Sequence, residues 1–164
     1  MVLDDIDILI FDFDGVLTNN LVYVDQTGSE SVSCSRADGL AFDVLRIMQK
    51  PAYIISTERN SVVTARAKKL NIPVIQGAKN KLKTLNQLAE EKQFNLQNVL
   101  FVGNDLNDYQ AMQACGYAAC PNDSHEKIKL ISSVVLNTKG GYGVVRELLE
   151  EVFHVDIVKI LNID

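Results

Sequence analysis

Short apolar runs alternate with longer amphipathic stretches along most of this chain. Runs of four to six mainly apolar residues predict buried strands, and apolar positions recurring every three or four residues predict helices between them. The predicted strands cover residues 6–11, 52–56, 73–76 and 99–102, with shorter candidates at 117–120 and 134–136. The predicted helices cover residues 39–49, 61–70, 81–92, 106–114, 124–129 and 144–152. This alternation predicts an α/β fold, a Rossmann-like parallel sheet with helices on both faces.

One segment departs from the alternation directly after the first strand. Residues 21–24 and 31–34 read as two short strands, and the polar run 25–30 between them predicts the turn of a β-hairpin. The hairpin would form a flap over about residues 20–35 and is too small to be a separate cap domain. The length of 164 residues favours a single domain spanning 1–164.

Charge and cysteine content restrict the class of partner. Sixteen basic and 21 acidic residues give a net charge of −5, which argues against nucleic acid or an anionic membrane as the main partner. The chain has no apolar run of membrane-spanning length, and its acidic N-terminus does not resemble a signal peptide, so a cytoplasmic protein is expected. Cys34, Cys115 and Cys120 form no C-x-x-C pair and are expected to be free thiols.

Two carboxylates follow the first predicted strand, in the run from Asp12 to Thr18. Asp12 and Asp14 are two residues apart, so both side chains can face one site, and Gly15 allows the backbone to turn away. In a parallel sheet the ligand site lies at the carboxyl ends of the strands. A carboxylate nucleophile and a second carboxylate that transfers protons suit phosphate-monoester hydrolysis, and Mg²⁺ would relieve their repulsion of the phosphate.

Further polar residues stand at the ends of the other predicted strands. Ser56 and Thr57 follow the second core strand, Lys81 opens a helix, and Asn104, Asp105 and Asp108 follow a later strand. Each of these positions taken singly is typical of a helix cap or a solvated side chain. Together they supply a hydroxyl, a cation and a metal-binding carboxylate in addition to the Asp12 and Asp14 pair, which favours a phosphoryl-transfer site.

These four motifs resemble those of the haloacid dehalogenase superfamily, and nearly the whole chain is similar to its capless sugar-acid phosphatases. The similarity includes the hairpin, the segment 36–39 and the glycine-rich segment 139–143. The resemblance implies that Asp12 is the nucleophile and Asp14 the acid and base, and that Ser56, Thr57 and Lys81 bind the phosphate. It also implies that Mg²⁺ is held by Asp12, the Asp14 carbonyl and Asp105, with Asn104 and Asp108 supporting these ligands.

Two substrates are known for such enzymes, the eight-carbon acid KDO-8-phosphate and the nine-carbon acid KDN-9-phosphate. This chain has Asn19-Asn20 and Thr57-Glu58 where the eight-carbon enzymes tend to have Asp-Gly and Gly-Arg. The second departure lies beside the expected substrate position, and for this reason we favour the nine-carbon acid. The expected substrate-binding residues are Glu58, Arg66, Lys69, Arg36 and Asp38. An exposed Glu58–Lys69 ion pair with no role in binding is the alternative for two of them.

Other interpretations of the sequence remain open at this point. The same fold could carry a phosphomutase or a dehalogenase, although a mutase usually needs a cap. A binding module without catalysis, or a receiver domain that stores an aspartyl phosphate, would use a similar acidic pocket. Because the hairpin is small, we also expect a homotetramer in which a neighbouring subunit covers each active site.

Overall fold

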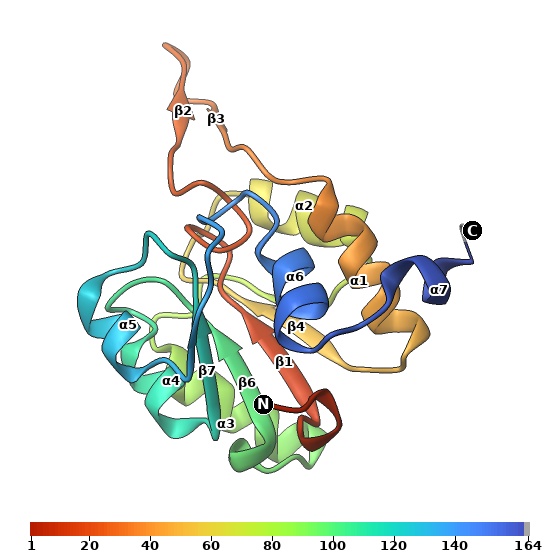
Figure 1. The fold of residues 1–164 in the computed structure, drawn as a ribbon. Coiled ribbons are helices and arrows are strands. Elements are labelled where there is room, and N and C mark those ends of the chain that lie inside the picture. Colours follow the sequence, from red (N-terminus) through yellow and green to blue (C-terminus); the bar gives the residue numbers. More distant parts are fainter. Residues whose placement is uncertain (163–164) are drawn as a thin grey trace.

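The computed structural model describes residues 1–162 and has a six-stranded parallel sheet at its centre (Figure 1). The strand order is β5-β4-β1-β6-β7-β8, with every neighbouring pair parallel. The strands are β1 (Ile8–Phe11), β4 (Ala52–Ile55), β5 (Val74–Ile75), β6 (Val99–Val102), β7 (Tyr117–Cys120) and β8 (Val134–Val135). The predicted α/β fold is confirmed, with β1 and β6 side by side at its middle.

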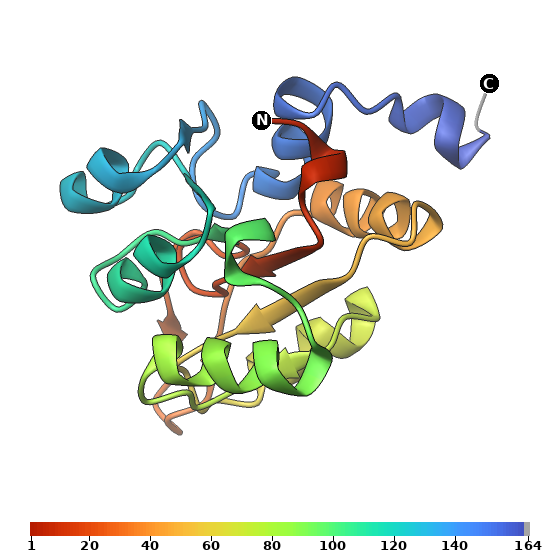
Figure 2. The same cartoon turned by 90° about the horizontal axis from the view of Figure 1, so that it is seen from below.

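Helices cover both faces of this sheet, as Figure 2 shows from below. One layer contains α1 (Ala37–Ile47), α2 (Val62–Leu70), α6 (Val144–Glu147) and α7 (Ile157–Leu161), and the other contains α3 (Lys81–Lys92), α4 (Tyr109–Ala114) and α5 (Glu126–Ile131). The central strand divides its side chains between the two layers. Leu9 and Phe11 pack with the first layer, and Ile8 and Ile10 pack with the second. Both faces of β1 are therefore buried, which explains its uninterrupted apolar sequence.

The C-terminal part differs from the expected single helix over residues 144–152. It begins as α6, continues as one π-helical turn at Leu148–Val152, and is followed by α7, which the sequence pattern did not predict. The helix expected over residues 106–114 also begins later, at Tyr109, because residues 105–108 form a turn. None of the helices described in residues 1–162 is both long enough and apolar enough to span a membrane.

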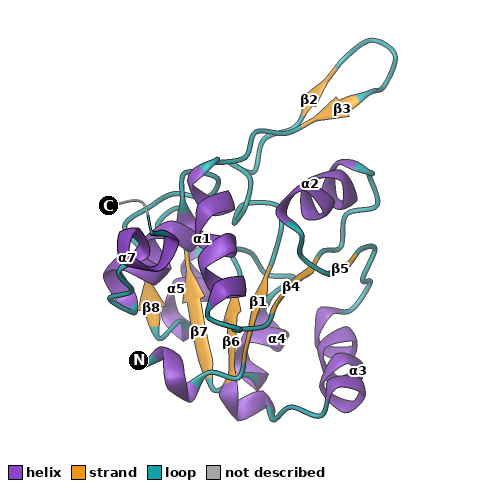
Figure 3. Ribbon diagram, turned by 90° about the vertical axis from the view of Figure 1, so that its right-hand side faces the viewer, coloured by secondary structure: helices purple, strands orange, loops and turns teal. Residues whose placement is uncertain are grey.

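The hairpin leaves the body of the molecule just after the first strand (Figure 3). Its strands are β2 (Tyr23–Val24) and β3 (Glu30–Ser31), which pair antiparallel and are shorter than expected. Every residue from 20 to 31 is exposed. The Asp25 carboxylate closes the turn by accepting hydrogen bonds from the Thr27 hydroxyl and from the backbone N–H groups of Thr27 and Ser29. These bonds, the hydroxyl bond most of all, hold the pKa of Asp25 below its usual value.

Candidate active site

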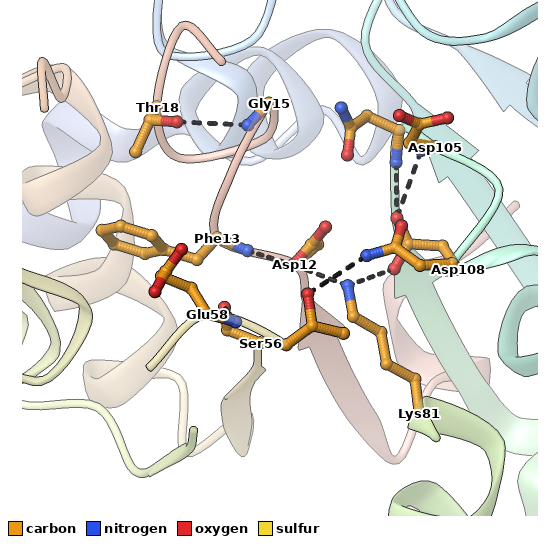
Figure 4. Close-up of polar contacts among 12 residues, drawn as sticks. Asp12, Phe13, Gly15, Thr18, Ser56, Glu58, Lys81, Asp105 and Asp108 are labelled. Atoms are coloured by element: carbon orange, nitrogen blue, oxygen red, sulfur yellow. Dashed lines mark hydrogen bonds and ion pairs between the residues drawn. The ribbon is translucent and has the colours of Figure 1, made fainter. Parts of the chain in front are cut away.

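A buried lysine joins two loops at the carboxyl edge of the sheet. The Lys81 Nζ lies 2.7 Å from Asp12 Oδ1 and 2.5 Å from Asp108 Oδ1, and all three side chains are almost fully buried (Figure 4). Asp12 continues β1, and its N–H donates to the Val102 carbonyl at the end of β6. Lys81 is the first residue of α3, which begins after the Asn80 cap, so its side chain crosses from the helix layer to the strand ends.

The second carboxylate of this network shapes the loop after β6. Asp108 Oδ2 accepts hydrogen bonds from the N–H groups of Asn104, at 2.9 Å, and Asp105, at 3.3 Å. One carboxylate thus holds both the lysine and the turn that presents Asp105, whose own side chain is exposed at the site. Support of the metal ligands by Asp108 stays a prediction, with which these contacts are compatible.

Burial strongly affects the ionisation of these groups. The pKa of Asp12 is raised to about 8, because burial and then the Asp108 charge raise it by more than Lys81 and the Phe13 N–H lower it. Burial would lower the pKa of Lys81, but Asp12 and Asp108 outweigh it and hold that pKa above its ordinary value. The network therefore has one ammonium for two carboxylates, and this imbalance together with burial disfavours the ionised form of Asp12.

Asp14 lies nearer to solvent than Asp12. Burial raises the pKa of Asp14 above its usual value, Glu58 and Glu30 raise it further, and Lys81 lowers it. The next residue, Gly15, has φ +78°, and a Cβ atom there would lie 1.9 Å from Asn104 Nδ2. Glycine is therefore required both for the turn after Asp14 and for the close approach of the two catalytic loops.

A cleft of about 300 Å³ opens above these residues. Its walls are formed by Asp12, Asp14, Asn20, Thr57, Asn104, Asp105, Leu106 and Asn107. The structure thus places in one cleft both carboxylates of the first motif, Asp105, and the predicted residues Thr57 and Asn104. It adds Asn20, Leu106 and Asn107, which were not predicted as site residues although their motifs were noted in the sequence. Their role depends on loop geometry, which residue type alone does not reveal.

Ser56 lies behind the cleft wall and is fully buried. Its hydroxyl oxygen accepts a hydrogen bond from the Glu58 N–H at 3.1 Å, and its N–H continues the pairing with Ile75. Next to the cleft lies a larger groove of about 650 Å³ between the starts of α3 and α4 and the α5 helix. Thr57 and Asn107 line both hollows and are joined by a 3.4 Å hydrogen bond, so they form the partition between them.

The oxygen atoms at the cleft fit a hard divalent cation. Asp12, Asp105 and the Asp14 carbonyl supply oxygen ligands only, which Mg²⁺ prefers. Within residues 1–162 no three acidic, histidine or cysteine side chains converge into a metal site, in this cleft or outside it, so the third protein ligand here would be a main-chain carbonyl. A cation beside the Asp12 carboxylate would favour its ionised form, which burial otherwise disfavours.

The predicted basic substrate residues line a different hollow. Arg36, Arg66 and Lys69 surround a space of about 400 Å³ at the base of the hairpin, together with Asp43. The Arg66 Nη2 donates to the Ser35 carbonyl at 2.7 Å, while its buried Nε has no partner within the described residues. Within one subunit, these three side chains are therefore not part of the cleft wall that contains Asp12.

The acidic substrate candidates differ from each other in their surroundings. Glu58 Oε1 accepts hydrogen bonds from the N–H groups of Arg59 and Asn60, and it makes no ion pair with Lys69 in the part of the chain that is described. Its charge nevertheless raises the pKa of Asp14, although Glu58 is not among the residues that line the cleft.

Asp38, a predicted substrate-binding residue, does not line the cleft that contains Asp12. Its carboxylate is buried beneath α6, where Oδ1 accepts hydrogen bonds from the N–H groups of Val145 and Arg146. It therefore ties α1 to the start of α6.

The glycine-rich segment 139–143 packs on the loop that follows Asp14, where the Gly141 N–H donates to the Val16 carbonyl at 2.9 Å. The three cysteines are free, and burial raises the pKa of Cys115 to about 12.

Comparison with known proteins agrees with this geometry. Residues 41–148 match the model of the haloacid dehalogenase-like hydrolase family. The 3-deoxy-D-manno-octulosonate 8-phosphate phosphatase of Escherichia coli is 30% identical over 148 residues, covering 90% of this chain and 79% of the relative.

Solved structures extend the likeness to the whole fold. A HAD family hydrolase from Streptomyces avermitilis has 38% identity and a TM-score of 0.89, covering 92% of this chain and 86% of that one. The octulosonate 8-phosphate phosphatase of Moraxella catarrhalis, in complex with magnesium, phosphate and KDO, has 28% identity and a TM-score of 0.87, covering 98% and 90%. The chain belongs to the haloacid dehalogenase-like hydrolases, as a phosphoric monoester hydrolase of the capless type that resembles KDO-8-phosphate phosphatase.

Proposed function

We propose that this protein is a Mg²⁺-dependent phosphatase that releases a free sugar acid from its phosphate ester through an aspartyl-phosphate intermediate. The observation that carries the proposal is the cleft with Asp12 at its base, bound to the buried Lys81, and with Asp14 and Asp105 on its walls. Relatives named for a sugar-acid phosphate support the substrate class.

The residues divide the reaction into two displacement steps. Asp12 attacks the phosphorus and the ester oxygen leaves, while Asp14 gives that oxygen a proton. Asp14 then takes a proton from water, whose oxygen attacks the phosphorus and frees Asp12. The raised pKa of Asp14 favours the protonated form that the first step needs. Lys81 holds Asp12 in place, and Mg²⁺ bound by Asp12, the Asp14 carbonyl and Asp105 would neutralise the phosphoryl charge.

For the sugar acid we favour KDN-9-phosphate, with nine carbons. Glu58 lies close enough to Asp14 to raise its pKa, so a carboxylate is available near the cleft to accept hydrogen bonds from substrate hydroxyls. A site matched to a hydroxyl discriminates strongly against a sugar that leaves it unpaired. The eight-carbon acid KDO-8-phosphate is the second candidate, and the names of the relatives favour it.

The test is phosphate release from both acids, with Mg²⁺ and with a chelator. We expect a higher kcat/KM for KDN-9-phosphate, no turnover without the metal, and a ratio that moves toward the eight-carbon acid in Glu58→Ala. Glu90→Ala is the matched control, because Glu90 is exposed on α3 about two and a half turns beyond Lys81. A wild type that preferred KDO-8-phosphate would establish the second candidate instead.

The proposal includes assembly into a homotetramer. Leu21, Val22, Tyr23 and Val24 expose between 50 and 63% of their surface on the hairpin, although apolar strands are normally covered. The second hollow with Arg36 and Arg66 opens at the base of this hairpin. A neighbouring subunit packed on the hairpins would cover the apolar strands and could bring such basic side chains to a site.

A further inference from the structure

The catalytic cleft contains a side-chain amide to which the reaction gives no task. Asn20 lines the same cleft as Asp12, Asp14 and Asp105. Its side chain is exposed, and no hydrogen-bond partner for it is found among the residues described. The amide of the preceding residue is used differently, since Asn19 Oδ1 accepts the Leu21 N–H at 3.3 Å. Asn20 therefore presents a free donor and a free acceptor to the cleft.

The backbone that carries this side-chain amide is held in place. Asn20 has φ +62°, in the left-handed region that asparagine tolerates better than most residues. Its N–H donates to Thr18 Oγ1 at 3.2 Å, and the same buried oxygen accepts the Gly15 N–H at 3.1 Å, a contact visible in Figure 4. Thr18 thereby ties the position of Asn20 to the turn that follows Asp14. A ligand group held by Asn20 would meet a preorganised partner.

The position of Asn20 relative to the carboxylates defines what it can contact. Asp12 is buried at the bottom of the cleft, where the phosphoryl group must lie, and Asp14 serves the ester oxygen. The part of the substrate that extends past Asp14 is the alcohol carbon chain. In a sugar acid this chain has hydroxyl groups next to the phosphorylated carbon, and an amide can both donate to and accept from such a hydroxyl.

We propose that Asn20 is a specificity-determining residue that binds the hydroxyl next to the phosphorylated carbon of a polyhydroxy phosphate ester. The inference rests on the proposed phosphatase function but does not depend on which sugar acid is the natural substrate. It explains why asparagine occupies a left-handed position at which glycine would be free of strain.

The experiment compares two small esters, glycerol 1-phosphate and propyl phosphate, which differ by the hydroxyls of the carbon chain. The variants are Asn20→Gly, which keeps the left-handed backbone, and Asn19→Ala, which removes the neighbouring amide outside the cleft. We expect wild type to prefer glycerol 1-phosphate in kcat/KM. Asn20→Gly should lower this preference by about 2- to 10-fold, the factor for one neutral hydrogen bond.

Each result gives a distinct answer. A preference that Asn20→Gly leaves intact, or that Asn19→Ala reduces equally, overturns the assignment of Asn20 while the phosphatase function stands. An altered preference with no turnover of sugar-acid phosphates upholds Asn20 and overturns the proposed substrate class. A wild type that hydrolyses neither ester nor any sugar-acid phosphate overturns both. The thermal unfolding midpoint of Asn20→Gly should equal that of wild type, which separates loss of contact from loss of fold.

Discussion

The carboxyl edge of the sheet and the hairpin flap are neighbours in the chain but differ in how they are stabilised. At the sheet edge, Asp12 and Lys81 retain only 3% and 2% of their exposure, and each finds its partners within the subunit. In the hairpin, Tyr23 and Val24 remain 61% and 63% exposed, and the strands are two residues each. The ion network at the sheet edge is complete within one chain, whereas the hairpin has apolar surface that no other part of residues 1–162 covers.

This difference separates two kinds of requirement. Catalytic groups must be held rigidly, and a buried ion network between strand ends does this without help from another molecule. A two-stranded hairpin is marginal alone and gains stability only from packing. Substitutions at the sheet edge should therefore change chemistry or folding, and substitutions in the hairpin should change assembly.

The largest effect is expected from Asp12→Asn, which removes the nucleophile. Activity on every phosphate ester should fall by roughly 10³-fold or more, because no other group can form the covalent intermediate. The fold should persist, since the amide oxygen can still accept the Phe13 N–H. Phosphate release measures the loss, and Asp7→Asn, at the amino end of β1 and exposed, is the control. Turnover of more than a few per cent of normal would rule out the aspartyl-phosphate mechanism.

Asp14→Asn should lose more activity on esters with a poor leaving group than on esters with a good one. On sugar phosphates, whose leaving oxygen needs a proton, we expect a fall of about 10²- to 10⁴-fold. On para-nitrophenyl phosphate, whose phenolate leaves without protonation, the fall should be much smaller. Parallel kcat measurements on the two esters decide the point. Equal losses on both would assign Asp14 to the metal or to structure and not to proton transfer.

Lys81→Met tests whether the buried network stabilises the fold. It leaves the Asp12 and Asp108 carboxylates buried without their ammonium, and breaking a buried ion pair in this way costs about 3–5 kcal/mol of unfolding free energy. Urea unfolding at neutral pH measures this cost. Lys83→Met, two residues further along α3 and exposed, should change stability by less than about 0.5 kcal/mol. Equal midpoints for the two variants would contradict a structural role for the network.

Asp38, which lies outside the catalytic cleft, should make the stability of the folded protein depend on pH. The pKa of Asp38 is raised from 3.8 to about 6, because burial raises it by more than the α6 N–H groups, Arg66 and Arg146 lower it. The folded protein therefore binds a proton here that the unfolded chain has lost, so this group lowers stability as pH rises from about 4 to 6. The Asp38→Asn variant keeps an oxygen that can accept the N–H groups at the start of α6. Its free energy of unfolding, relative to that of wild type, should rise by on the order of 2 kcal/mol between pH 4 and pH 7.

Unfolding of both proteins at the two pH values checks this prediction. Asp43→Asn is the control on the same helix, where the carboxylate is exposed beside Arg46 and its loss should be nearly neutral. A constant difference between Asp38→Asn and wild type across this range would show that Asp38 does not titrate as inferred.

The smallest effect on subunit stability is expected in the hairpin. The double variant Val22→Ser, Val24→Ser should change the unfolding free energy of the isolated subunit by no more than about 0.5 kcal/mol, since both residues are exposed. Its oligomeric state should nevertheless fall below a tetramer in light scattering at micromolar concentration. Leu130→Ser, 84% exposed on α5, should leave assembly unchanged. A fully active wild-type monomer would refute the shared-site proposal.

The sequence by itself determined the elements and the chemistry of the strand ends. Short apolar runs and helical periodicity are local properties, so they predicted the α/β fold and all six strands of the sheet. The spacing of Asp12 and Asp14 after β1 placed both on one cleft, because side chains two apart on a strand share a face. Lys81 and Asp108 were likewise expected at the site, and the structure joins them in one ion network.

The tertiary structure decided which of the remaining polar residues share a site. Asp38 lies beneath α6, 107 residues away along the chain, and Arg66 turns toward the Ser35 carbonyl. Asn20 enters the cleft because Thr18 holds its backbone in the left-handed region. These placements depend on contacts between distant segments and on single backbone angles. Residue type and spacing carry no information about either, because burial and direction are set only when the helix layers pack on the sheet.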